Sequence, residues 1–254
     1  MTLATGSRRS SEPLTITLHP GQAAYVLDFV PRVTVVSAGQ GGGKTWGGYV
    51  WLLTRMRRQA GQSWLVGFPD YGLLTRVILN QPDPERQTLV DFLRSVGERP
   101  KLKTQERRIE CVSGQIFFAS GEDLVGWEGA HVAGAFVDEF DMCPLAVYRL
   151  AMERTRMRQG QVLLTGTPRR VAWVREEFGA ALAAGAPWVK LVHFPTTANP
   201  RYSQAAMEEA RARLPAGEFK RLYLGEWAAK EGGGVFRREW WHYLDKPPVV
   251  KRTI

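Results

Sequence analysis

The chain is poor in cysteine: only Cys111 and Cys143 occur among its 254 residues, far apart and without partners at metal-ligand spacing. This scarcity excludes a disulfide framework and a cysteine-based zinc site, and it fits a reducing compartment. Long apolar runs are also missing, since the longest, around residues 179–189, is far too short to span a bilayer. The N-terminus, MTLATGSRRSSEP, lacks the apolar stretch of a signal peptide. We therefore expect neither a membrane protein nor a secreted one.

Acidic residues are outnumbered by basic ones, 25 against 34, which leaves a net charge of +9 and a pI near 9.8. This balance indicates a polyanionic partner, most simply nucleic acid. Arginine predominates among the basic residues and suits bidentate phosphate contact, although a GC-rich genome also enriches it. Hydrophobic residues make up 44% and charged residues 23%, which excludes wholesale disorder. The length fits one domain, or one domain with a small annex.

Short apolar runs alternate with segments of helical periodicity along most of the chain. We expect strands at 33–39, 63–69, 133–140, 161–168 and 188–194, a hairpin over 107–120, and helices at 22–29, 45–59, 85–96, 146–157, 174–185 and 203–214. This alternation predicts an α/β fold, with a mostly parallel central sheet and helices on both of its faces. Residues 1–14 are polar, and we expect them to be flexible.

The sequence AGQGGGKT, residues 38–45, lies between the first expected strand and the next helix. It matches the Walker A pattern, with Ala38 where a glycine is usual. Glycines let backbone N–H groups surround a triphosphate, the Lys44 ammonium reaches the β- and γ-phosphates, and the Thr45 hydroxyl ligates Mg²⁺. We therefore predict a nucleotide site made of Gly39, Gln40, Gly41, Gly42, Gly43, Lys44, Thr45 and Trp46.

A second signal is the pair of acids, Asp138 and Glu139, that closes the apolar run at 133–140. In a Walker B strand the aspartate holds Mg²⁺ and the glutamate polarises the attacking water as general base. By itself such a pair is as easily a solvated strand end or a helix cap. Its coupling to a phosphate loop in the same sheet favours the catalytic interpretation.

Two further elements are weaker on their own. The sequence TGTP at 165–168 ends an expected strand, and its small hydroxyl residues could contact the γ-phosphate or simply close a turn. The sequence HPGQ at 19–22 precedes the phosphate-loop strand. The amide of Gln22 could pair with an adenine edge, or the segment could be no more than an exposed helix start.

Together these elements resemble the ATPase half of a large terminase subunit, the DNA-packaging motor of tailed bacteriophages. The matching stretches are PGQ, AGQGGGKT, FVDEFD and TGTP, followed by TTANP at 196–200, YLGEW at 223–227 and then GGVFRREWWHYL. The resemblance extends from about Leu18 to the end of the chain. The order and spacing of these motifs, and the passage from GEW to VFRREWW, are more specific than any one of them.

The resemblance implies a P-loop ATPase domain of RecA-like (ASCE) type over residues 15–230, including a small C-terminal lid, and a linker over 231–254 toward a nuclease domain that this chain lacks. It implies the cofactors ATP and Mg²⁺, with Thr45 and Asp138 as metal ligands and Glu139 as the base. It assigns adenine contact to Gln22, and it assigns the coupling of hydrolysis to movement to Thr165, Gly166 and Thr167.

The implied partners are double-stranded DNA, a portal protein, a small terminase subunit and further copies of the chain in a ring on the procapsid. The implied location is the host cell cytoplasm, without a membrane. Nuclease activity is not expected of this chain.

The sequence departs from the family at two places where many members carry an arginine. One holds Gln40, inside the phosphate loop, and the other is near Glu128. The identity of the arginine that offsets charge on the transferring phosphoryl group is therefore left open by the sequence. The candidates by position are Arg154, Arg156, Arg158, Arg169 and Arg170, each of which is otherwise solvated surface or a DNA contact.

Two alternatives remain at this stage. A superfamily 2 helicase is suggested because DEFD at 138–141 mimics a DExD box, but this chain is too short for the second RecA-like domain of such helicases. A nucleotide-binding assembly module that hydrolyses little ATP is favoured somewhat by the two missing arginines.

Overall fold

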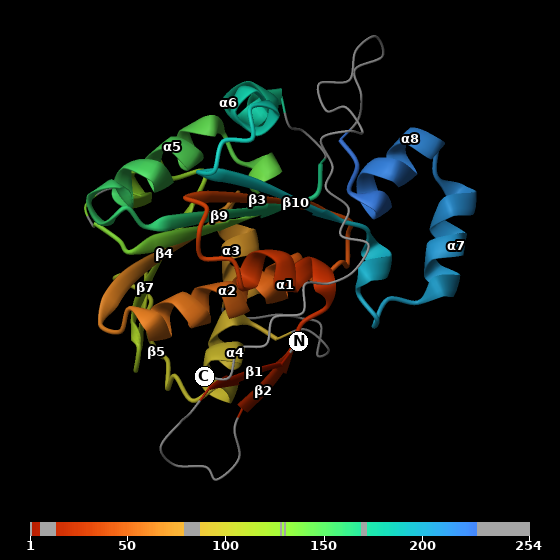
Figure 1. The fold of residues 1–254 in the computed structure, drawn as a ribbon. Helices are drawn as coiled ribbons and strands as arrows, with labels where there is room; N and C mark the ends of the chain where they lie inside the picture. Colours follow the sequence, from red (N-terminus) through yellow and green to blue (C-terminus); the bar gives the residue numbers. More distant parts are fainter. Residues whose placement is uncertain are drawn as a thin grey trace.

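The computed structural model describes residues 2–5, 14–78, 87–127, 129, 131–168 and 172–227, and its central element is a sheet of eight strands (Figure 1). The strand order is β10-β3-β9-β8-β4-β7-β6-β5. Six strands run parallel: β3 (Val33–Ala38), β4 (Gln62–Phe68), β7 (Gly114–Ser120), β8 (Gly134–Asp138), β9 (Gln161–Gly166) and β10 (Val189–Phe194). At one edge, β6 (Arg108–Cys111) and β5 (Lys101–Lys103) are antiparallel.

Helices cover both faces of this sheet (Figure 1). One face carries α1 (Pro20–Val26), α2 (Lys44–Arg58), α3 (Tyr71–Ile78) and α4 (Leu89–Ser95). The other carries α5 (Leu145–Arg154) and α6 (Ala172–Ala183). Two further helices, α7 (Gln204–Arg213) and α8 (Ala216–Phe219), stand apart in the figure and lead into a π-helical turn at Lys220–Leu224. Together they form a small C-terminal unit, and its role as the lid that the resemblance implies stays a prediction.

The strand residues alternate between two hydrophobic cores, one on each face of the sheet. Along β3, Val33 and Val35 join the core under α5 and α6, whereas Val36 and Ala38 join the core under α1 and α2. The neighbouring parallel strands follow the same rule, because successive side chains of a strand point to opposite faces. Burial on both faces explains why these strands are apolar throughout in sequence.

The mostly parallel sheet flanked by helices confirms the predicted fold class, and the predicted strands agree with the structure to within one or two residues. The sequence interpretation missed α3, whose start is marked only by Asp70, which accepts a hydrogen bond from the Leu73 N–H at 2.7 Å. It also missed β1 (Thr2–Thr5), which pairs with β2 (Leu14–Thr17) inside the segment expected to be flexible. The expected linker at 231–254 lies outside the described residues. No helix within the described ranges is long and apolar enough to cross a bilayer.

The closest packing of α2 on the sheet is at Gly48, where an added Cβ would lie 2.2 Å from the Phe136 ring of β8. Overpacking costs about 1–3 kcal/mol, more than the ~1 kcal/mol that alanine gains over glycine in a helix. We expect Gly48→Ala to lower the free energy of unfolding, measured by urea denaturation. The control Gly217→Ala, with no atom within 4 Å of its Cβ, should leave that free energy unchanged or raise it. A more stable Gly48→Ala protein would contradict this packing.

Candidate functional site

Three strand ends meet at the carboxyl edge of the sheet, where ligands of open α/β sheets bind. Strand β9 lies between β3 and β8, so the TGTP segment is next to both the phosphate loop and the acidic pair. In the register of these strands, Thr165 is opposite Val36 on one side and Asp138 on the other. The predicted site residues of the three motifs are therefore brought together.

The phosphate loop requires glycine at several positions. At Gly39 a Cβ would lie 2.2 Å from the Thr196 hydroxyl oxygen and 2.3 Å from the Tyr223 carbonyl oxygen. Gly41 and Gly43 have φ values of +70° and +85°, a region that favours glycine. Gly43 is the N-cap of α2 and offers no side-chain partner to the helix. The first N–H groups of this 15-residue helix therefore face the loop as an anion site.

Hydrogen bonds connect the charged residues of the site to the two threonines of TGTP. The Lys44 ammonium donates to Thr167 Oγ1 at 2.8 Å and to the Gly39 carbonyl at 3.1 Å. The Thr45 hydroxyl donates to Asp138 Oδ2 at 2.6 Å, and Thr165 donates to the other oxygen of the same carboxylate. One threonine of TGTP thus contacts the loop lysine, and the other contacts the strand-end acid.

The Asp138 carboxyl is buried and accepts hydrogen bonds from both Thr45 and Thr165. Burial raises its pKa to about 6, and the negative charge of Glu139 acts in the same direction, while hydrogen bonds from Thr165 and Thr45 and the charge of Lys44 lower it. A divalent cation beside the carboxylate would favour its ionised form. In nucleotide sites Mg²⁺ takes one or two protein oxygens and completes its shell with phosphates and waters. The Thr45 hydroxyl and the Asp138 carboxylate fit that requirement.

Glu139 has a backbone conformation that the sequence could not reveal. Its φ is +49°, in the left-handed region. That region costs a residue with a side chain roughly 1–2 kcal/mol, and such strain concentrates at functional sites. Next to it, Gly166 leaves no room for a side chain, since a Cβ would lie 2.4 Å from Asp141 Oδ1. The end of β8 and the end of β9 are therefore fitted closely together.

The HPGQ segment, residues 19–22, forms hydrogen bonds with the backbone of the phosphate loop. Gln22 is 4% exposed, its amide nitrogen donates to the Gly43 carbonyl at 2.8 Å, and its Oε1 accepts from the His19 N–H at 3.3 Å. His19 Nε2 lies 3.0 Å from the Gly42 carbonyl, and the Tyr25 hydroxyl donates to the Lys44 carbonyl at 3.2 Å. The structure thus places the Gln22 amide on the loop backbone, and its contact with adenine stays a prediction.

Trp46 and Gln40 were both predicted to contact nucleotide. The Trp46 indole packs edge-on against Phe92 of α4, with ring centroids 5.0 Å apart. The backbone of Gln40 is held instead by the C-terminal unit, because its N–H donates to the Leu222 carbonyl at 2.7 Å. Nucleotide contact by these two residues stays a prediction.

The sequence interpretation gave no role to the residues that hold the loop from the other side. The Thr196 hydroxyl donates to the Gln40 carbonyl at 2.7 Å, and the Asn199 amide donates to the Gly41 carbonyl at 2.6 Å. Ser37 of β3 donates to the Gly225 carbonyl at 2.9 Å. The motifs TTANP and YLGEW therefore brace the phosphate loop, and their position after the last strand was the only signal of it.

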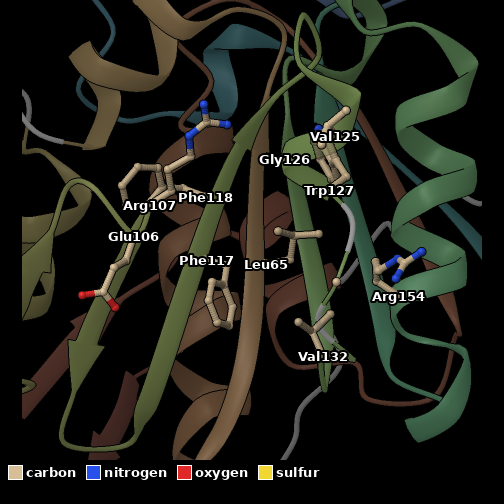
Figure 2. Close-up of a pocket in the computed structure, with 11 residues that line it drawn as sticks. Leu65, Glu106, Arg107, Phe117, Phe118, Val125, Gly126, Trp127, Val132 and Arg154 are labelled. Carbon is tan, nitrogen blue, oxygen red and sulfur yellow. The ribbon is translucent and has the colours of Figure 1, made fainter.

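A cavity of about 340 Å³ lies on the α5 face of the sheet, lined by Phe117, Trp127, Val132 and Arg154 (Figure 2). The Trp127 indole donates to the Ser120 carbonyl at 2.8 Å and anchors the segment that leads toward Glu128. Glu128, Arg169 and Arg170 lie outside the described residues. Arg154 pairs with Glu153 at 2.8 Å.

The family model described as terminase large subunit, T4likevirus-type, N-terminal, matches residues 35–242. The chain belongs to this family. The match places the chain in the N-terminal part of a terminase large subunit. Membership decides against the superfamily 2 helicase alternative. No curated protein sequence matches the chain significantly.

Solved structures show the same fold. The large terminase ATPase domain of Thermus phage P74-26 has a TM-score of 0.64 at 19% identity, over 84% of this chain and 94% of that one. The large terminase of a thermophilic bacteriophage, in complex with ADP, has a TM-score of 0.69 at 19% identity, over 84% and 54%. The HK97 bacteriophage large terminase has a TM-score of 0.64 at 14% identity, over 84% and 51%. The chain thus spans about half the length of the last two.

The brace on the phosphate loop can be tested with Thr196→Val, which keeps the shape of the side chain and removes its donor. The Gln40 carbonyl then loses a partner, which costs about 1–3 kcal/mol for a buried group and disfavours the binding-competent loop. We expect the ADP affinity, measured by calorimetry, to fall by about tenfold. Ser203→Ala, which removes the N-cap of α7 without touching the loop, is the control. Equal affinities for the two variants would contradict the brace.

Proposed function

We propose that this terminase domain hydrolyses ATP bound with Mg²⁺ at the carboxyl edge of the sheet and uses the energy to move double-stranded DNA into a procapsid. The observation that carries the proposal is the hydrogen-bonded network that joins Lys44, Thr45, Asp138 and the two threonines of TGTP. The large terminase of a thermophilic bacteriophage has been observed with ADP and with ATP-γ-S, and both structures share this fold.

Each residue of the site has a defined task in this proposal. The N–H groups of the loop and the Lys44 ammonium bind the β- and γ-phosphates. Thr45 and Asp138 hold Mg²⁺, which when bound neutralises charge on the phosphates. Glu139 orients the attacking water and accepts its proton.

Hydrolysis can be sensed at the carboxyl end of β9, because Thr165, near the end of the strand, contacts Asp138 and Thr167, just after the strand, contacts Lys44. When Lys44 binds a γ-phosphate, its ammonium exchanges partners, and the bond to Thr167 is among those affected. Thr165 responds in the same way to any change at Asp138. Both hydroxyls belong to the segment 165–167, so loss of the γ-phosphate is transmitted to one strand end.

The partners follow from charge and from the family. The net charge of +9 supports binding to DNA, and we propose a portal protein, a small terminase subunit and a ring of copies on the procapsid as further partners in the host cytoplasm. The alternative, an assembly module that hydrolyses little ATP, is favoured by Gln40, which supplies no charge to the transferring phosphoryl group. Turnover measurements on two variants separate the motor from the module.

Lys44→Ala removes the loop's ammonium, so ATP binding or hydrolysis should be lost. Steady-state ATP turnover should fall by far more than tenfold, the factor that corresponds to ~1.4 kcal/mol of barrier. Lys101→Ala, an exposed lysine on β5, serves as the control and should hydrolyse ATP at the parent rate. Turnover within tenfold of the parent would mean that the phosphate-loop assignment is wrong.

Glu139→Gln should keep binding of ATP with Mg²⁺ but abolish turnover, because an amide preserves the shape and cannot accept a proton from water. Binding is measured by calorimetry and turnover by phosphate release, with the exposed Glu176→Gln of α6 as control. If binding is lost together with turnover, Glu139 is structural. If the parent chain binds ATP but turns over no faster than Glu139→Gln, the module alternative holds.

A further inference from the structure

At the opposite edge of the sheet from the candidate site, a cavity of about 280 Å³ is lined by three arginines, Arg55, Arg58 and Arg158, together with Phe29 and Gln161. These residues come from the loop after α1, the last turn of α2, the 3₁₀ turn at Arg156–Arg158 and the first position of β9. None of them belongs to the nucleotide site. The cavity therefore needs its own explanation.

Arg55 forms the floor of this cavity and is 1% exposed. Its guanidinium donates to Gln161 Oε1 at 2.9 Å, to the Val26 carbonyl at 2.8 Å and to the Asp28 carbonyl at 2.5 Å. These partners are neutral oxygens, and no carboxylate in the described part of the chain forms an ion pair with Arg55. Asp28 attracts this charge without forming an ion pair with it. A buried guanidinium that lacks a paired counter-ion is costly, so a bound anion would be stabilised here.

Arg58 and Arg158 form the exposed rim, and neither has a carboxylate partner among the described residues. The guanidinium carbon of Arg58 lies 3.7 Å from the centroid of the Phe29 ring, and that of Arg55 lies 4.3 Å from it. The Phe29 ring thus packs against the guanidinium groups of Arg55 and Arg58. Arg158 forms the other basic part of the rim.

The acids nearest to this edge in the fold are already neutralised. Asp28 pairs with Lys190 at 2.6 Å, Glu98 pairs with Arg57 at 2.9 Å, and Glu153 pairs with Arg154 at 2.8 Å. Asp28 also attracts Arg55, so its single charge, shared with Lys190, offsets only part of the positive potential of the three cavity arginines.

We propose that this cavity binds a phosphodiester group, and that the amino-terminal edge of the sheet is a contact surface for the backbone of duplex DNA. Guanidinium forks match the geometry of phosphate oxygens, and the exposed rim lets a polymer approach while Arg55 supplies charge from below. The choice of duplex DNA as the polymer rests on the proposed function. The proposed contact is to the phosphodiester backbone, which carries no sequence information, so binding at this surface should be independent of sequence.

Two rigid elements connect this surface to the nucleotide site. Helix α2 begins with Lys44 in the phosphate loop and ends with Arg58 at the cavity, about 22 Å away at 1.5 Å per residue. Strand β9 begins with Gln161 at the cavity and ends beside Lys44 and Asp138. A DNA phosphate and a nucleotide would thus bind at opposite ends of the same helix and the same strand.

The test is the double variant Arg58→Ala with Arg158→Ala, compared with Arg94→Ala plus Arg213→Ala, which removes the same charge from exposed arginines on α4 and α7. Affinity for a short duplex of arbitrary sequence is measured by fluorescence anisotropy across a salt series. We expect the cavity variant to bind at least about tenfold more weakly at low salt. Its plot of log K against log salt should be shallower by about 0.9 for each DNA phosphate that the variant no longer neutralises. The control should match the parent.

Three further readouts decide what a weaker affinity means. The cavity variant should keep the parent's melting temperature and its ATP turnover without DNA, whereas a fall in either would show a structural role and overturn the inference. The single variant Arg158→Lys, which keeps the charge, should retain most of the parent's slope of log K against log salt. Competition by poly-glutamate as strong as that by DNA would indicate an acidic protein partner instead and would also count against the proposal.

The failures are distinguishable. If the parent chain binds duplex DNA and the cavity variant binds it as well as the control does, the inference is overturned and the proposed function stands. If the parent hydrolyses ATP but binds no duplex DNA even at low salt, both the inference and the DNA part of the proposed function fail.

Discussion

The strand register at the centre of the sheet is the constraint on which the rest of the site depends. Thr165 is paired with Val36 of β3 and with Asp138 of β8, so its hydroxyl reaches the Asp138 carboxylate while Thr167 reaches Lys44. A slip of one residue would turn Thr165 to the other face of the sheet and carry its hydrophobic neighbours with it. The two hydrophobic cores fix this register, because each face of β3 and β9 is buried against a different set of helices. The packing that stabilises the fold thereby also positions the residues of the candidate site.

Much of this could be predicted from sequence because its signals are local. An apolar run, a glycine-rich turn and a helix pattern follow one another within 33–59, and the chemistry of a phosphate loop requires that order. The acids at the end of β8 and the hydroxyls at the end of β9 were similarly marked by the strands that precede them. The adjacency of β3, β9 and β8 does not follow from local pattern, and the structure supplies it.

Contacts between distant parts of the chain could not be predicted in this way. Thr196 and Asn199 contact loop residues that are more than 150 positions away in sequence, and nothing in TTANP itself specifies this. Gln22 illustrates the same limit: its amide was equally compatible with a base edge and with the Gly43 carbonyl, and only the three-dimensional arrangement puts it on the latter. Arg55 is the clearest example, since sequence alone predicts that a basic residue in the last turn of a helix is exposed to solvent and interacts with the helix C-terminus. Burial by Phe29, Trp51 and Gln161 makes it the floor of a cavity instead.

The location of the arginines also constrains how charge on the transferring phosphoryl group can be offset. Arg156 and Arg158 precede β9, and the six residues of β9 separate them from Thr167 by about 20 Å at 3.3 Å per residue. Arg154 pairs with Glu153 and lies toward the same amino-terminal edge, where its carbonyl accepts a hydrogen bond from the Val132 N–H. None of the three can therefore reach the γ-phosphate of its own subunit. In the motor proposed above, that role would fall to a cation from the residues after Pro168 or from a neighbouring copy. The arginines of the amino-terminal edge are then free to contact a different phosphate, which is consistent with one domain that separates its nucleotide and DNA contacts by the length of one helix.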